Sequence, residues 1–126
     1  MQFTKYLQGL RVFIIEDEAL ISMMTEDMLS DFGCISVGIA TNVTDAMEQV
    51  TRIDCDAVVM DVNLHGEQTF AIARLLSKKS IPFIFTTGYS IDGIPEDLRH
   101  VPILQKPFRE RDLAEILGAA VRDKAA

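Results

Sequence analysis

A short apolar run that ends in a carboxylate is the feature that most limits how this chain can fold. Asp56 is followed by an unbroken apolar stretch, then by Asp61, and the chain then turns through residues 63–66. Such a run, bounded by turn residues, indicates a strand buried on both faces of a sheet. Asp61 therefore lies at the rim of the sheet. It could be a turn-forming residue or a group that is presented to a ligand.

Other apolar stretches alternate with segments of helical periodicity along the whole chain. Besides 56–61, strands are predicted at 11–15, 35–40, 81–87 and 101–104. Helices are predicted from about residue 18 to 32, around 43–50, at 67–77 and at about 110–122, where apolar residues recur at helical spacing. This alternation predicts right-handed crossovers and a doubly wound α/β fold. We expect a five-stranded parallel sheet of order 2-1-3-4-5 with helices on both faces.

The first helix and the fourth helical region have distinctive sequences. The first helix carries Leu20, Met24 and Met28 on one side and is followed by Gly33, a plausible C-terminal cap. We interpret most of the six methionines, which fall on helix faces, as core filler. The segment 88–100, the fourth helical region, is irregular because it holds two glycines, a proline and little periodicity. It is predicted to be a loop with at most a turn or two of helix.

The composition excludes several classes of partner. A net charge of −7 argues against nucleic acid and anionic membranes, since both need a basic face. No apolar run approaches the roughly 20 residues of a membrane span, and residues 1–9 lack the apolar core of a signal peptide. We expect a cytoplasmic protein in which Cys34 and Cys55 are reduced. The 126 residues predict one domain, 1–126, with its core at about 10–122 and no output domain.

Polar residues converge at one edge of the predicted sheet. The carboxyl ends of parallel strands share an edge, and in this strand order the ligand crevice lies beside the first and third strands. Glu16 and Asp17 follow the first strand and are therefore expected near Asp61. Thr87 and Lys106 end the fourth and fifth strands at the same edge.

This set of groups permits phosphoryl chemistry. Carboxylates in one crevice repel one another, and Mg²⁺, which prefers oxygen ligands and also accepts phosphate oxygens, relieves that repulsion. An aspartate can act as a nucleophile toward phosphorus. Lys106 supplies a positive charge, and the hydroxyl group of Thr87 can donate a hydrogen bond to a phosphoryl oxygen. Together these groups suffice for accepting a phosphoryl group.

Over essentially its whole length, the chain resembles bacterial two-component response-regulator receiver domains. The resemblance rests on residues 16–18 after the first strand, Asp61 after the third, Thr87 after the fourth and Lys106-Pro107-Phe108 after the fifth. It implies that Asp61 accepts a phosphoryl group from a histidine kinase or a histidine phosphotransfer protein. It also implies a Lys106–Pro107 bond that is commonly cis. The implied Mg²⁺ ligands are Glu16, Asp17, Asp61 and the backbone carbonyl of Asn63, and the implied phosphoryl contacts are Thr87 and Lys106.

The sequence departs from the usual family pattern at the switch. An aromatic residue is usual three positions before the lysine, but here that position is Ile103. Residues 85–89 resemble a subset of single-domain receivers with a Phe-x-Thr-Gly-Tyr stretch, which are often paired with kinases of the HWE type. The resemblance therefore predicts a stand-alone regulator that signals by protein contact or acts as a phosphate sink. We expect activation to order the segment 88–100, without a ring flip.

Other classes of protein share parts of this pattern. A dehalogenase-like phosphatase needs a second aspartate where Asn63 stands, and a flavodoxin-like cofactor binder would be repelled by residues 16–18. A receiver-shaped interaction module that works largely without phosphorylation is the remaining alternative. Residues 16–18 could also be only the solvated start of a helix. Strand alternation lets only one of Thr86 and Thr87 face the crevice, and the position before the glycine favours Thr87. His65 is given no catalytic role.

Overall fold

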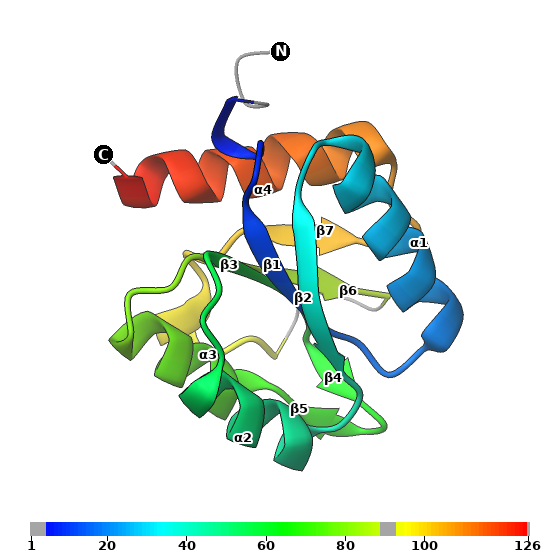
Figure 1. The fold of residues 1–126 in the computed structure, drawn as a ribbon. Helices are drawn as coiled ribbons and strands as arrows, with labels where there is room; N and C mark the ends of the chain where they lie inside the picture. The colour runs from blue at the N-terminus through cyan, green and yellow to red at the C-terminus, as the bar shows by residue number, and fades with distance from the viewer. Residues whose placement is uncertain (1–4, 89–92, 126) are drawn as a thin grey trace.

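Five parallel strands form one central sheet. A computed structural model describes residues 5–88 and 93–125. The sheet has the order β2-β1-β3-β6-β7, in which β6 and β7 are the fourth and fifth predicted strands (Figure 1). This order confirms the predicted 2-1-3-4-5 arrangement. The strands are β1 (Arg11–Ile15), β2 (Ile35–Ala40), β3 (Ala57–Asp61), β6 (Phe83–Thr87) and β7 (Ile103–Gln105).

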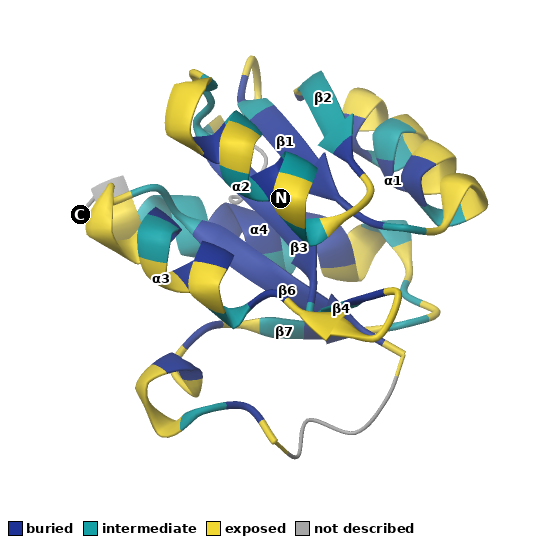
Figure 2. Cartoon of the chain, turned by 90° about the horizontal axis from the view of Figure 1, so that it is seen from below, coloured by how far each residue is buried: buried dark blue, intermediate teal, exposed yellow. Residues whose placement is uncertain are grey.

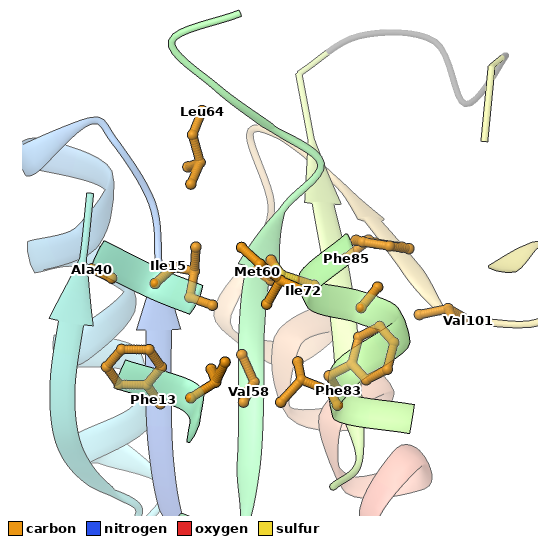
Figure 3. Packing of buried hydrophobic residues seen from close by; sticks show 14 of the residues in the cluster. Phe13, Ile15, Ala40, Val58, Met60, Leu64, Ile72, Phe83, Phe85 and Val101 are labelled. Atoms are coloured by element: carbon orange, nitrogen blue, oxygen red, sulfur yellow. The ribbon is translucent and has the colours of Figure 1, made fainter. Parts of the chain in front are cut away.

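Helices cover both faces of this sheet. In the described part of the chain they are α1 (Ala19–Asp31), α2 (Val43–Arg52), α3 (Phe70–Lys78) and α4 (Glu110–Ala125). Strand side chains alternate between two cores. The first core joins Phe13, Val58, Met60, Phe83 and Phe85 to α2 and α3 (Figure 3). The second core joins Val12, Ile14, Val59, Ile84 and Leu104 to α1 and α4. None of the helices in the described residues is long and apolar enough to cross a membrane.

Helix α1 ends as predicted at Gly33. This glycine has a φ of 84° and donates its N–H to the Ser30 carbonyl, while the Cys34 N–H bonds to the Leu29 carbonyl. The pair of bonds is a Schellman motif, which requires the left-handed conformation that glycine adopts without strain. Cys34 and Cys55 are free thiols, as expected.

The inward face of α1 differs from the prediction. Its buried residues are Ser22, Thr25 and Leu29, whereas Leu20, Met23 and Met24 are 69%, 60% and 48% exposed. Figure 2 shows the outer surface of α1 as exposed. The core-filler interpretation is therefore wrong for Met23 and Met24, although Met60 is fully buried. The Thr25 hydroxyl group donates to the Ile21 carbonyl within the helix, whereas the Ser22 hydroxyl group is buried without a hydrogen-bond partner in the described part of the chain.

A small hairpin follows β3, where none was predicted. Its strands are β4 (Asn63–Leu64) and β5 (Glu67–Gln68), which pair antiparallel around His65 and Gly66. These two turn residues have φ values of 51° and 86°, the signature of a type I′ turn. The helix predicted from residue 67 therefore begins only at Phe70. The strands predicted from 81 and 101 likewise begin two residues later, at Phe83 and Ile103.

The segment between β6 and β7 is irregular, as predicted. Residues 89–92 lie outside the described residues. Further on, the chain contains one 3-10 turn, η2 (Glu96–Leu98), and places Ile94, Leu98 and Val101 in the first core. Arg74 of α3 pairs with Asp97 at 3.0 Å. Residues 94–101 are therefore anchored to the first core although they are irregular.

Candidate functional site

Strand alternation brings three of the predicted site residues to one face of the sheet edge. Ile14, Val59 and Leu104 belong to the second core. Glu16, Asp61 and Lys106 follow them by two residues on β1, β3 and β7 and therefore fall on the same face. The convergence predicted from the strand order is present in the structure.

One ammonium group joins two buried carboxylates at this edge. Lys106 Nζ lies 2.6 Å from Asp61 Oδ2 and 2.6 Å from Glu16 Oε1, and all three side chains are at most 10% exposed. Burial alone would lower the pKa of Lys106, but its hydrogen bonds to Asp61 and Glu16 raise that pKa. The protonated form of Lys106 is therefore favoured, and its positive charge lies beside Asp61.

The site contains more carboxyl groups than the single ammonium group of Lys106 can neutralise. Burial raises the pKa of Glu16 to about 7, although hydrogen bonds from Lys106 and from the Glu18 N–H oppose the rise. An additional cation near such a carboxyl group stabilises its ionised form. The carboxylates of Glu16, Asp17 and Glu18 also lie close enough together to hold a metal ion.

Asp17 faces the hairpin that follows β3. Its Oδ2 accepts a hydrogen bond from the His65 N–H at 3.0 Å and lies 3.4 Å from His65 Nδ1. Burial pushes the pKa of Asp17 upward, but the bonds from the His65 N–H and from the Glu16 side chain lower it below its usual value. The ionised form is therefore favoured.

A cleft of about 400 Å³ lies between these groups. Its lining residues are Asp17, Glu18, Asp61, Asn63, His65, Gly66, Gly88 and Lys106. The Asn63 N–H donates to Asp61 Oδ1, while the Asn63 side-chain oxygen is buried without a hydrogen-bond partner among the described residues. Carboxylate and amide oxygens are the ligands that Mg²⁺ prefers, so the donor set fits this ion.

The two threonines at the end of β6 lie differently from each other. The sheet register pairs Asp61 with Thr86, and alternation groups Thr87 with Phe85 of the first core. Both threonines are buried. The Thr87 carbonyl accepts the Lys106 N–H at 2.8 Å, so the end of β6 is tied directly to the lysine. The Lys106–Pro107 bond is cis, as the resemblance implied.

Comparison with known proteins decides the family. The family model for the response regulator receiver domain matches residues 12–118. The chain belongs to this family.

Relatives of this receiver domain agree in sequence and in fold. It is 34% identical over 115 residues to the transcriptional regulatory protein PdtaR of Mycobacterium tuberculosis, covering 88% of this chain and 56% of that protein. The chain thus spans about half the length of this curated relative. The solution structure of SdrG from Sphingomonas melonis Fr1 superposes with a TM-score of 0.80 at 39% identity, covering 90% of this chain and 97% of SdrG. The response regulator PhyR from Brucella abortus gives a TM-score of 0.81 at 26% identity, covering 96% of this chain and 52% of PhyR.

One residue of the receiver cleft was missed from the sequence. His65 received no role, yet its backbone and its ring both contact Asp17. A histidine followed by glycine after a buried strand is a weak signal for a type I′ turn, and the hairpin was not recognised from it. Without the hairpin, nothing in the sequence places this ring beside the first strand.

Proposed function

We propose that this receiver domain is a response regulator that accepts a phosphoryl group on Asp61 in the presence of Mg²⁺. The observation that supports this most is the pair of bonds from Lys106 to Asp61 and Glu16 beside an acidic cleft. The donor in this proposal is a histidine kinase, of which the HWE type is one candidate class, or a histidine phosphotransfer protein. The output is contact with a further protein or withdrawal of phosphate from the kinase.

Asp61 is oriented for nucleophilic attack. Its Oδ1 accepts the Asn63 N–H at 3.0 Å and its Oδ2 accepts the Lys106 ammonium, so the carboxylate is held at both oxygens. In the proposed step a carboxylate oxygen forms a bond to phosphorus while the bond from phosphorus to the donor's imidazole nitrogen breaks. The imidazole keeps the electron pair and takes a proton from solvent. Asp61 then carries an acyl phosphate.

The remaining site residues hold charge and position. Asp17, Asp61 and the Asn63 carbonyl would hold Mg²⁺ directly, and Glu16 would contribute through water. When bound, the ion neutralises negative charge on the transferring phosphoryl group. Lys106 is near enough to Asp61 to contact the phosphoryl oxygens as well. For Thr87 we propose a hydrogen bond to the phosphoryl group, formed when the end of β6 shifts from the first core toward Asp61.

The test is phosphorylation by a small donor. Protein with acetyl phosphate and Mg²⁺, followed by intact mass, should gain one phosphoryl group, and Asp61→Asn should gain none because the nucleophile is lost. Asp56→Asn is the matched control, since Asp56 precedes the same strand at the opposite edge and pairs with Arg11. This control should behave as the unmodified chain does. Phosphorylation of Asp61→Asn would make the site assignment wrong.

A further arm tests the function as a whole. If the unmodified chain gains no phosphoryl group with Mg²⁺ present, it is a receiver-shaped interaction module. We also propose a cytoplasmic location. The free thiols of Cys34 and Cys55 support it, because thiols persist in a reducing compartment.

A further inference from the structure

The hairpin after β3 holds His65 in a defined place at the mouth of the cleft. Leu64, the preceding residue, is 1% exposed and packs in the first core, which anchors the hairpin. The Thr69 hydroxyl group donates to the Asp61 carbonyl at 2.7 Å and closes the loop from the other side. The His65 ring is 68% exposed, so it contacts the cleft and remains open to solvent.

The ring and Asp17 are spaced as two ligands of one metal ion. His65 Nδ1 lies 3.4 Å from Asp17 Oδ2. Two ligand atoms that are each about 2.1 Å from an ion are about 3.4 Å apart when the angle between their bonds is tetrahedral. Asn63, on the same hairpin, adds a buried side-chain oxygen without a hydrogen-bond partner in the described structure, and it lines the same cleft.

We propose that His65 is a nitrogen ligand beside Asp17, so that the cleft binds a borderline divalent transition-metal ion such as Zn²⁺ at the place where Mg²⁺ is expected. The inference rests on the proposed cation site and adds to it a ligand of different chemistry. Mg²⁺ is bound by oxygen atoms, whereas Zn²⁺ is bound well by imidazole nitrogen. His65 would therefore set which cations this receiver domain accepts.

A substitution of His65 should affect the binding of Zn²⁺ and of Mg²⁺ differently. Any carboxylate site binds Zn²⁺ more tightly than Mg²⁺, so a high zinc affinity alone says nothing about His65. Loss of the imidazole should weaken Zn²⁺ binding and leave Mg²⁺ binding unchanged. The informative quantity is the ratio of the two affinities in variants of His65.

His65→Asn is the appropriate variant. Asparagine tolerates the left-handed backbone at this position, and Asn-Gly is a favoured type I′ turn, so the hairpin is retained. Its shorter side chain lacks the imidazole nitrogen. The chain has a second histidine, His100, which is exposed and does not line the cleft. His100→Asn is the matched control.

Calorimetric titrations with Zn²⁺ and separately with Mg²⁺, at about pH 8, provide the test, since that pH is above the usual pKa of imidazole. His65→Asn should lower the Zn²⁺ affinity about tenfold or more and change the Mg²⁺ affinity by less than about twofold. His100→Asn should alter neither. Equal Zn²⁺ affinities for His65→Asn and the unmodified chain would overturn the inference.

A direct spectroscopic reading excludes zinc bound elsewhere, for example at Cys55. In nitrogen-15 spectra of the imidazole side chains, substoichiometric Zn²⁺ should shift the Nδ1 resonance of His65 and leave that of His100 in place. A shift of neither ring would contradict the proposal. The Mg²⁺ titration and the Asp61 mass assay report on the proposed function separately, so failure of the zinc arm alone leaves that function standing.

Discussion

Glu16 and Asp17 are adjacent in the sequence, but their carboxylates are engaged differently. Glu16 Oε1 bonds to the Lys106 ammonium, and Glu16 Oε2 accepts the Glu18 N–H at 3.1 Å. Asp17 lines the cleft, which Glu16 does not. The two acids are therefore unequal as candidate metal ligands, although the sequence presents them as a pair.

This difference predicts a ranking of magnesium affinities. Asp17→Asn should weaken Mg²⁺ binding about tenfold or more, because a direct ligand is lost. Glu16→Gln should weaken it less, because its oxygen atoms already serve Lys106 and Glu18. Titration of Mg²⁺ followed by amide chemical shifts gives both affinities. A smaller loss for Asp17→Asn than for Glu16→Gln would contradict the ranking.

The positions of Glu16, Asp61 and Lys106 could be predicted from the sequence because they depend on one rule. In a parallel sheet every strand end lies at the same edge, so the strand order alone places these residues together. Their roles in catalysis and metal binding stay predictions, as does the choice of Thr87 over Thr86. The exposure of Met23 and Met24 was not predictable, since α1 has apolar residues on more than one face and periodicity cannot choose between them.

At the scale of elements, β2 depends on a glycine. Gly38 has a φ of 155°, and a Cβ atom there would lie 3.1 Å from the ring of Phe13. The register of β1 and β2 shifts next to this residue, between Val12 and Phe13. Phe13 is fully buried in the first core and cannot move aside readily. The interruption of this strand, visible in the sequence, is thus a packing requirement.

Gly38→Ala should destabilise the protein by about 1–3 kcal/mol, because the added methyl group overpacks the first core and strains the backbone. Chemical denaturation measures the change. Gly88→Ala is the control, because that glycine has no positive φ and a Cβ there would meet nothing within 4 Å. The control should stay within about 0.5 kcal/mol of the unmodified chain. Equal stabilities for the two variants would show that Phe13 yields to the methyl group.

At the same scale, the hairpin β4–β5 was missed because its strands are too short to show an alternating pattern. Each contains two residues. The following residues, Glu67 and Gln68, favour helix intrinsically, and the buried position of Leu64 overrides that preference. Tertiary contacts therefore decided the start of α3.

The molecule as a whole has two cores, one on each face of the sheet, and the site residues are distributed between these two faces. Asp61, Glu16 and Lys106 lie on the side of the second core, whereas Thr87 and Ile103 lie on the side of the first. Residues 94–101 are anchored in the first core by Ile94, Leu98 and Val101. We therefore expect a conformational change that begins at Asp61 to move the end of β6 before it affects residues 94–101.

Hydrogen exchange with Mg²⁺ and the phosphate mimic beryllofluoride should locate that rearrangement. We expect the amides of Gly88 and Gly93 to change most, because Gly88 directly follows β6 and Gly93 precedes the residues that are anchored in the first core. The amides of Leu98 and Val101 should change little, since they are hydrogen-bonded and lie in the first core. Changes at Leu98 and Val101 as large as those at Gly88 would contradict this expectation and mean that the whole segment 88–100 responds as one unit.

Lys106 follows β7, one of the two edge strands of the sheet. β7 has three residues and a single neighbour, β6, so few hydrogen bonds hold it in place. Short edge strands are in general among the parts of a fold that open at a lower free energy than global unfolding. Opening of β7 would withdraw the ammonium group and leave Glu16 and Asp61 without it. The short β7 thus controls how negative the cleft is, because the site without Lys106 would hold its carboxylates with no cation from the chain beside Asp61.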